Sequence, residues 1–523
     1  MKEESLQGME SIQGLDNMSS GQPERAGRRE WIGLAVLALP TLILALDMSV
    51  LYLAIPHLSA DLSPSGVQLL WIMDIYGFMI AGCLITMGMI GDRIGRRKLL
   101  MIGAAAFGAA SAAAAFSNSA EMLITARAFL GVAGATLMPS TLALISNMFK
   151  DPKQRGLAVG VWMSCFSGGM ALGPLAGGLL LEYFHWGAVF LLGVPVMIVL
   201  LITAPILLPE YRDAGAGRLD LSSVCLYLAA VMPFIYGLKE WAQDGLHGVP
   251  MLAMLAGAAF GAAFFVRQRR LDHPLLDLNL LKDRRISVSL GMMLLCTAAM
   301  GGIGLMVSQY LQLVEGLSPL RAGIWTLPSM LAVTVGSMLA SSIVSRISPG
   351  HVVSACLVII AMGSLMLTQV AGSSGFALLI AGYVVIAIGL GPIGVLATDF
   401  IIGSAPPERA GSASAMSETS SELGMALGVA ILGSVGAAVY SRQLDVPNTA
   451  GIPADAADAS RDTIAGAVSA ANKLSPDLAD RLMAIAHAAF TDALNAIAAI
   501  SAGLVLIMAV LAFIVLRRVR TIE

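Results

Sequence analysis

Long apolar runs dominate this chain and limit what it can fold into. A helix of about 20 apolar residues crosses the roughly 30 Å hydrocarbon core of a bilayer. Fourteen such runs lie near residues 31–55, 69–90, 99–116, 122–145, 157–180, 186–208, 221–238, 249–266, 286–311, 319–343, 351–370, 376–402, 411–437 and 493–516. Only 12% of the residues are charged, against about 25% in soluble proteins. The sequence therefore predicts an all-α membrane protein.

The positive charges of the connecting segments test this helix count and give the chain an orientation. If the amino terminus is cytosolic, the predicted cytosolic segments hold 24 of the 31 Lys and Arg residues, which agrees with the positive-inside rule. The predicted outer side holds six, four of them in one long loop where the bias is expected to weaken, and Arg127 falls within a span. A missed or extra helix would reverse the bias in every later loop. We therefore predict that both termini lie in the cytoplasm.

A weak internal echo indicates two related halves. The segment 87–100 (MGMIGDRIGRRKLL) is echoed by 342–352 (SIVSRISPGHV), which places Arg346 opposite Arg93. Together with the helix count, the echo predicts two pseudo-symmetric six-helix bundles with helices 7 and 8 inserted between them. The predicted units are a disordered cytosolic tail (1–30), an N-terminal bundle (31–208), a linker with helices 7 and 8 (209–285), a C-terminal bundle (286–516) and a cytosolic tail (517–523).

The C-terminal bundle contains one long extracytoplasmic loop, predicted at residues 441–492. Ser475 is a good helix N-cap, and Pro476 suits the first helical position. Apolar residues follow on one side of the expected helix: Leu478, Leu482, Ile485, Ala486 and Ala489. The sequence leaves open whether this segment forms a helical hairpin over the outer mouth or has no functional role.

Four carboxylates, Asp47, Asp74, Glu418 and Glu422, lie inside the apolar runs. An ionised acid near the bilayer centre costs at least about 2.5 kcal/mol, which favours a purpose such as carrying protons or holding a cation. Removal from water favours the neutral form of an acid, whereas a nearby cation favours its charged form. A proton and a cation can therefore compete for one carboxylate. Asp74 and Glu422 are the first choices for proton coupling, and Asp47 and Glu418 could equally contact a cation.

The alternative for each acid is a partnership with a buried base such as Arg127, or a position near a helix end. This alternative is strongest for Asp74, which lies closest to the outer surface. Glu418 and Glu422 are four residues apart and share one face of the thirteenth helix. Both halves of the chain thus contribute acids to a predicted central cavity.

The predicted cytosolic loop between the second and third helices combines glycines, an acid and several arginines. Its motif residues are Gly88, Asp92, Arg93, Gly95, Arg96 and Arg97. The glycines suit a tight turn, the opposite charges can form a latch between helix ends, and Asp92 can cap the following helix. Simple anchoring of the loop by its positive charges is the alternative.

Two further motifs lie within helices. In the fourth helix, the buried base Arg127 precedes Gly131 and Gly134. In the fifth helix, the motif residues are Gly169, Gly173, Pro174, Gly177 and Gly178. Small residues four apart let helices approach closely, and the proline removes one backbone hydrogen bond, which predicts a bend or hinge. Glycine-rich packing without a functional role is the alternative.

These three motifs resemble those of the major facilitator superfamily. The loop at 88–100 resembles its signature loop, and the stretch that begins at Arg127 resembles its conserved-arginine motif, although Leu130 stands where a glutamine is common. The fifth-helix stretch at 169–178 is similar to the motif associated with the antiporter branch.

The closest resemblance is to the fourteen-helix drug:proton antiporters, and it covers essentially the whole chain. The acidic stretches of that family look like residues 45–51, 70–76 and 417–424. The sequence departs from the family in the tenth helix, where some members carry a further acid and this chain has neutral residues around Pro328 and Ser329. The departure puts in doubt which cations are accepted.

The resemblance implies the major facilitator fold and a secondary active transporter rather than an enzyme. The implied cargo is lipophilic cations: quaternary ammonium compounds, dyes such as ethidium, and fluoroquinolones. The implied setting is the bacterial inner (plasma) membrane. An inward-open, protonated cavity would receive a cation that displaces protons, and after outward rocking external protons would evict it. The proton gradient would replace a cofactor. We expect no metal, catalytic residue or nucleic-acid partner, and a chain that functions as a monomer in the lipid bilayer.

Other functions fit the sequence less well. An ATP-driven pump is disfavoured because the chain has no GxxxxGK[ST] loop. The acids, without a matching cluster of buried bases, favour a cationic cargo over an anionic one. Two alternatives stay open: the same fold exporting a lipid, an amino acid or a siderophore, and a non-transporting membrane receptor whose acids tolerate neutralisation.

Overall fold

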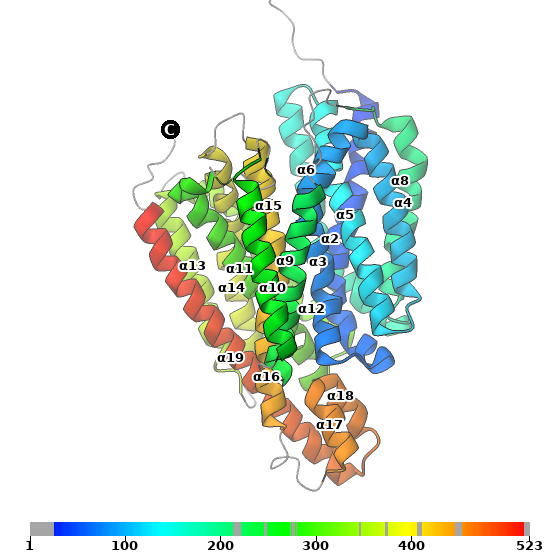
Figure 1. Ribbon diagram of the computed structural model, residues 1–523, viewed down its shortest axis with the longest axis vertical. Helices are drawn as coiled ribbons and strands as arrows, with labels where there is room; N and C mark the ends of the chain where they lie inside the picture. The colour runs from blue at the N-terminus through cyan, green and yellow to red at the C-terminus, as the bar shows by residue number, and fades with distance from the viewer. Residues whose placement is uncertain are drawn as a thin grey trace, which may run out of the picture.

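The structure is a computed structural model that describes residues 26–212, 221–244, 248–271, 274, 278, 280–344, 347–371, 375–404, 410–444 and 452–516. The part of the chain that it describes is almost entirely helical (Figure 1). It contains 14 helical segments that are long and apolar enough to cross a membrane, which confirms the predicted count. Arg346 and the tails at 1–25 and 517–523 lie outside the described residues, and the first helix already begins at Arg28.

Six spans form the N-terminal bundle. They are α2 (Arg28–Leu62), α3 (Gly66–Ile94), α4 (Arg96–Ala115), α5 (Ala120–Met148), α6 (Pro152–Tyr183) and α7 with α8 (Ala188–Leu191 and Gly193–Leu207). Local sequence explains where two of them begin. Ser65 accepts a hydrogen bond from the Gln68 N–H at 3.2 Å, and the Gln68 side chain accepts one from the Ser65 N–H at 3.0 Å. This capping box starts α3. Ser119 caps α5 by accepting a hydrogen bond from the Met122 N–H at 3.2 Å.

Six further spans form the C-terminal bundle. They are α11 (Arg284–Gln309) with the π-helical turn η2 (Tyr310–Val314), α12 (Pro319–Val344), α13 (Pro349–Leu367), α14 (Gly375–Gly403), α15 (Ala410–Leu427) with the π-helical turn η5 (Gly428–Leu432) and α16 (Gly433–Gln443), and α19 (Pro476–Leu516). A short 3₁₀ turn, η1 (Leu280–Lys282), precedes α11, and Asp283 caps α11 by accepting a hydrogen bond from the Arg285 N–H at 2.7 Å. The predicted arrangement of two six-helix bundles is confirmed.

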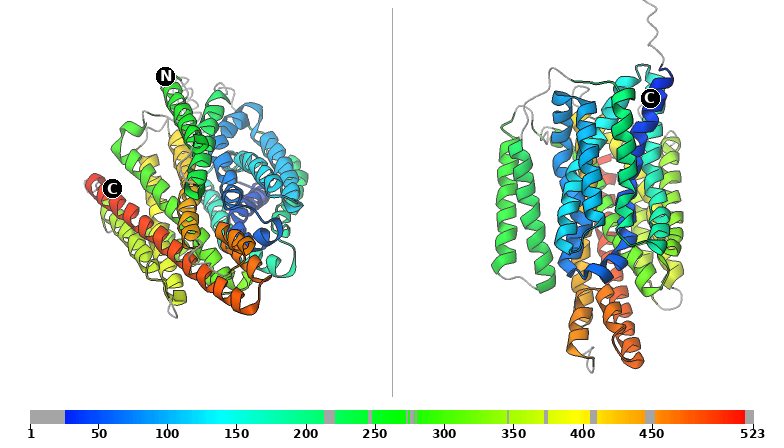
Figure 2. Two further views of the ribbon diagram at one scale, coloured as in Figure 1. Left: turned by 60° about the horizontal axis from the view of Figure 1, so that its bottom comes forward. Right: turned by 90° about the vertical axis from the view of Figure 1, so that its right-hand side faces the viewer.

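The two inserted helices are α9 (Leu221–Asp244) and α10 (Gly248–Gln268). They form a hairpin that stands at the edge of the two bundles (Figure 2). Helix α9 faces the bundles and contacts α3 on one side and α16 with η5 on the other. The hairpin therefore touches both halves of the molecule, and α9 ends six residues later than the apolar run predicted.

The two bundles meet in the half of the membrane region that the charge pattern predicts to be the outer half. A Cβ atom placed on Gly178 of α6 would lie 2.7 Å from the Cα atom of Leu320 in α12. A Cβ atom placed on Gly433 of α16 would lie 2.7 Å from a methyl carbon of Leu70 in α3. The Ser308 hydroxyl of α11 donates to the carbonyl oxygen of Tyr52 in α2 at 2.8 Å. These contacts join the bundles at the predicted outer end.

Helices fill most of the segment predicted as an extracytoplasmic loop. The short helices α17 (Ala454–Asp462) and α18 (Ile464–Ala471) pack together beside the start of α19, beyond the predicted outer end of the spans (Figure 1). Helix α19 begins at Pro476, where the sequence predicts a helix start, and continues without a break into the last span. Leu482 and Ala486 are fully buried. The segment is therefore helical, and whether it has a functional role stays open.

Candidate functional site

Asp47 lies in the middle of α2 and forms a buried ion pair with Arg127 of α5. The distance between Oδ2 of Asp47 and Nη1 of Arg127 is 3.4 Å. Arg127 is only 2% exposed and donates from Nε to the carbonyl oxygen of Ile72 in α3 at 2.7 Å. Its guanidinium carbon lies 4.9 Å from the ring centroid of Tyr76. The arginine thus ties three helices of the N-terminal bundle together, and the pairing alternative holds for Asp47.

Asp74 of α3 forms a second buried ion pair, with a base that the sequence analysis placed outside the membrane. The distance between Oδ2 of Asp74 and Nζ of Lys239 is 2.8 Å, and the two residues are 2% and 1% exposed. Lys239 directly follows the apolar run 221–238 and was counted among the outer charges. Because α9 continues to Asp244, the lysine lies inside the span.

The two buried bases correct one sequence argument, namely that the acids have no matching buried bases. The signal that could have found Lys239 is its helical spacing. Ile235 of α9 is buried against α3 and α15. Lys239 lies four residues later, so both side chains project from the same face of α9.

Glu418 and Glu422 of α15 differ from the two aspartates. Among the residues that the structure describes, neither glutamate forms an ion pair with a base. Glu422 is 8% exposed, and its Oε2 atom has no hydrogen-bond partner within the described part of the chain. A Cβ atom placed on Gly77 of α3 would lie 3.9 Å from the Glu422 carbonyl oxygen. Glu422 therefore lies where the two bundles meet.

Two tyrosines lie near the acids. The hydroxyl of Tyr52 in α2 lies 3.7 Å from the sulfur of Met425 in α15, three residues after Glu422. The ring of Tyr76 in α3 lies beneath the guanidinium of Arg127, the partner of Asp47. The structure thus places Glu422 of one bundle against the helix of the other bundle that carries Asp74, and the central cavity stays a prediction.

The signature-loop residues form contacts within the N-terminal bundle. Asp92, in the last turns of α3, accepts from Nε of Arg96 at 2.7 Å and lies 2.6 Å from its Nη2 atom. Arg96 also donates from Nη1 to the Pro139 carbonyl oxygen of α5 at 3.5 Å. Asp92 does not cap α4: Gly95 occupies the N-cap position, and Asp92 pairs with the Arg96 side chain one turn later instead.

Gly95 and Arg97 join this loop to the end of α8 through Glu210. Gly95 has φ +113°, a conformation that side-chain-bearing residues rarely adopt, and a Cβ atom placed on it would overlap the Glu210 carboxylate. The Arg97 N–H donates to Glu210 at 3.1 Å, and its guanidinium donates to the Leu208 carbonyl oxygen at 2.9 Å. Gly88 and Arg93 lie on α3, Arg93 in its last turn. Glu210 was not among the predicted site residues, because it follows the apolar run 186–208 and belongs to no motif.

The fifth-helix motif places its glycines against two different helices. Gly169, Gly173 and Gly177 of α6 face Leu42, Ser49 and Val50 of α2. Gly178 faces α12, and the Pro174 carbonyl oxygen contacts Gly323 of the same helix. Close approach is possible because these positions lack a side chain. Helix α6 is therefore wedged between its own bundle and the opposite one.

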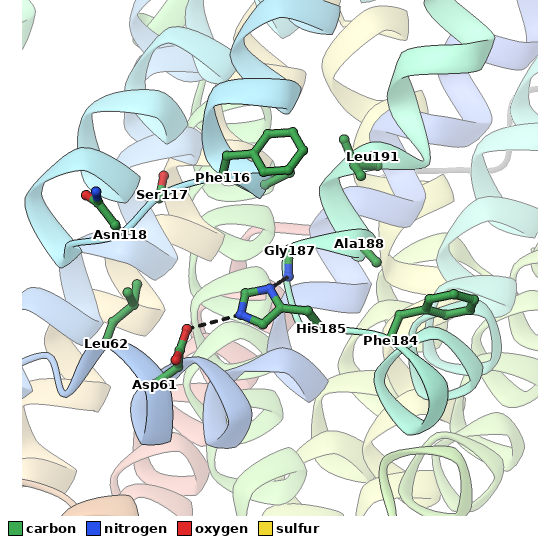
Figure 3. Close-up of a pocket in the computed structure, with 11 residues that line it drawn as sticks. Asp61, Leu62, Phe116, Ser117, Asn118, Phe184, His185, Gly187, Ala188 and Leu191 are labelled. Carbon is green, nitrogen blue, oxygen red and sulfur yellow. Dashed lines mark hydrogen bonds and ion pairs between the residues drawn. The ribbon is translucent and has the colours of Figure 1, made fainter.

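A separate cavity of about 550 Å³ lies at the predicted outer end of the N-terminal bundle (Figure 3). Asp61, at the end of α2, accepts from Nε1 of Trp186 at 2.8 Å and lies 3.1 Å from Nε2 of His185. None of the residues that line this cavity is a predicted site residue. Within the described residues, no group of three or more His, Cys, Asp or Glu side chains is arranged to hold a metal ion.

Comparison with known proteins places the chain among membrane transporters. A sequence model described as the Major Facilitator Superfamily matches residues 37–429. The chain is 42% identical over 494 residues to the multidrug efflux pump LfrA of Mycolicibacterium smegmatis, covering 94% of this chain and 98% of LfrA. It is 34% identical over 497 residues to the methyl viologen resistance protein SmvA of Salmonella typhimurium, covering 92% and 97%.

Solved structures share the fold at low sequence identity. A bacterial homologue of the human lysosomal transporter Spinster, in an inward-facing and unoccupied conformation, superposes with a TM-score of 0.67 at 15% identity, covering 94% of this chain and 98% of that one. The nucleoside transporter NupG superposes with a TM-score of 0.58 at 13% identity, covering 94% and 100%. At this identity the likeness shows the fold, and it confirms the predicted fold class.

Proposed function

This chain belongs to the Major Facilitator Superfamily, and we propose that it exports lipophilic cations across the bacterial plasma membrane in exchange for protons. The expected cargo is quaternary ammonium compounds, dyes such as ethidium, and fluoroquinolones, and both termini would lie in the cytoplasm. The multidrug efflux and resistance relatives support export of small molecules. One relative is named for resistance to methyl viologen, an organic cation with two positive charges.

The observation that carries this proposal is the pair of glutamates in α15. Glu418 and Glu422 are four residues apart on one helix face, and within the described residues neither has a basic partner. A carboxylate removed from water is stabilised either by a proton or by a nearby cation. These two groups are therefore suited to hold protons in one state and an organic cation in another, because no built-in base already neutralises them.

The two aspartates are expected to act differently from the glutamates. Asp47 and Asp74 already form neutral pairs with Arg127 and Lys239. A proton that neutralised either aspartate alone would leave a buried base without its partner, which is costly in a low-dielectric interior. We therefore assign direct proton exchange first to Glu422, with Glu418 as a cation contact. Asp74 takes part in proton coupling only together with its lysine.

Alternating access supplies the transport step. The bundle contacts lie at the predicted outer end, so the acids are expected to be reached first from the cytosolic side. A cation that enters would displace protons from the glutamates, and after the bundles rock, external protons would replace the cation. Each net positive charge that moves inward contributes about 2.3 kcal/mol per 100 mV of membrane potential. The membrane potential would therefore drive export if more positive charge enters with the protons than leaves with the cargo.

Ethidium efflux tests the proposal directly. Cells that produce the protein would be loaded with ethidium, energised, and followed by fluorescence before and after addition of a protonophore. We expect efflux that stops when the proton gradient collapses. Efflux that continues without the gradient would contradict antiport, and binding of ethidium without any flux would favour the receptor alternative.

A further inference from the structure

Lys239 places a positive charge deep inside the region that the transport mechanism uses. Its Nζ atom lies 2.8 Å from the Asp74 carboxylate and 3.9 Å from the ring centroid of Trp71. Within the described part of the chain, no other residue forms an ion pair or side-chain hydrogen bond with either member of the pair. The ammonium group is thus held by a carboxylate and the face of an indole ring.

This arrangement has the chemistry of a binding site for organic ammonium ions. A carboxylate neutralises the charge, and an aromatic face attracts a cation through its quadrupole, most strongly when the ring is that of tryptophan. In this structure a side chain of the protein itself fills the site. Asp74 and Trp71 both lie on α3 of the N-terminal bundle, whereas the lysine comes from the inserted helix α9.

The pair lies beside the glutamates rather than on an isolated lipid-facing surface. Ile235, one helical turn before Lys239, packs in one buried cluster with Phe78 of α3 and Ala426 of α15. Glu422 is one turn before Ala426 on α15. A Cβ atom placed on Gly77, three residues after Asp74, would lie 3.9 Å from the Glu422 carbonyl oxygen. The charge on Lys239 therefore acts on the same region that the glutamates occupy.

We propose that Lys239 is a specificity-determining residue, a built-in cation that neutralises Asp74 and thereby sets the net charge that the transport site presents to its cargo. This inference rests on the proposed export of cations. With Lys239 in place, the two α15 glutamates are, of the four predicted site acids, those without a basic partner among the described residues. Removal of its charge adds one uncompensated negative charge beside them. The inserted hairpin then tunes cargo choice, in addition to covering the edge of the bundles.

Charge-balance variants test this inference. Lys239→Met removes the base, Asp74→Asn removes the acid, and the double variant removes both, while Lys239→Arg keeps the charge. Each would be purified in lipid nanodiscs, and equilibrium binding of ethidium, a monocation, and methyl viologen, a dication, would be measured. The readout is the ratio of the two affinities, because a loss of packing weakens both ligands together and leaves that ratio unchanged.

We expect Lys239→Met to shift the affinity ratio toward methyl viologen by roughly tenfold, the size of effect that one extra unit charge has on another across about 10 Å at an effective dielectric constant near 20. Asp74→Asn should shift the ratio the opposite way. The double variant and Lys239→Arg should both return the wild-type ratio. The double variant also guards against misfolding, because removing both partners leaves no buried charge unpaired.

An unchanged ratio in folded Lys239→Met, or a double variant whose ratio differs from the wild type, would overturn the inference. Either result leaves the proposed function intact if the wild-type protein still shows proton-driven ethidium efflux. Failure of the wild-type protein to bind or export either cation would instead count against the proposed function itself.

Discussion

Pro174 of α6 and Gly323 of α12 lie backbone against backbone, so the two bundles touch at a point where no side chain fits. A Cβ atom placed on Gly323 would overlap the Pro174 carbonyl oxygen. One of these residues belongs to the predicted fifth-helix motif, and the other comes from the opposite bundle. Closure of the predicted outer side therefore depends on Gly323, which belongs to none of the sequence motifs.

Gly323→Val should hold the bundles apart at this contact. Overpacking of a close interface costs about 1–3 kcal/mol, so we expect a shift toward the outward-open state and an ethidium efflux rate reduced roughly tenfold. The shift would be measured in a background without the five native cysteines. In that background a cysteine at position 320 would be labelled from outside with a membrane-impermeant maleimide.

Gly168→Val provides the matched control on α6. No atom lies within 4 Å of a Cβ atom placed at that position, so labelling and efflux should stay near the wild-type level. Equal labelling of both variants would show that the Pro174 contact does not close the outer side.

Glu422→Gln should abolish most proton-driven efflux while leaving the fold intact. The amide keeps the shape of the side chain but cannot release a proton or carry a negative charge. An interaction with a charged group is worth about 1.5–3 kcal/mol, so we expect a loss of roughly tenfold to a hundredfold. Proton release on addition of ethidium to the purified protein should fall in parallel.

The control for this variant is Glu182→Gln, a glutamate exposed at the far end of α6. Its efflux and proton release should match the wild type. If Glu422→Gln and Glu418→Gln both retained full proton-driven efflux, the α15 glutamates would not be the coupling site.

Arg127→Met should destabilise the N-terminal bundle. Removing one partner of a buried ion pair typically costs about 3–5 kcal/mol, and this variant also loses the hydrogen bond to the Ile72 carbonyl oxygen. We expect a lower thermal unfolding temperature in detergent. The double variant with Asp47→Asn should recover part of the loss, because it leaves no unpaired carboxylate.

Arg321→Met tests whether loss of any arginine has this effect, since Arg321 is exposed at the start of α12. Its unfolding temperature should stay close to that of the wild type. A similar drop in both single variants would mean that the buried pair is not the source of the stability.

Gly95→Ala should weaken the signature loop. A residue with a side chain at φ +113° is strained by about 1–3 kcal/mol, and the new methyl group would displace the Glu210 carboxylate. We expect a lower unfolding temperature and reduced efflux. Gly88→Ala is the comparison, because a Cβ atom there would first meet Pro139 at 3.9 Å. Equal effects of the two substitutions would contradict the role of the Gly95 conformation.

Several features of the fold could be read from local sequence. The apolar runs predict the spans, since only a helix satisfies its own backbone hydrogen bonds in lipid. The helix start at Pro476 follows from its own residue type and that of its neighbours. The prediction was wrong for a residue directly after the end of an apolar run. Lys239 follows an apolar run by one position, and a window of hydropathy cannot tell whether the helix continues past it.

The sequence by itself determined the membrane setting, the number of spans and which acids lie within them, because these depend on the transfer of single helices from water to lipid. Only the tertiary structure decided which acids are already neutralised. Asp74 and Lys239 are far apart in the chain, and their pairing depends on how α9 docks against α3. Docking of this kind is set by side-chain shape at the helix interface, and the spacing of residues along α9 does not show which helix it docks against. It separates the two paired aspartates from the two glutamates, to which we propose that cargo and protons bind.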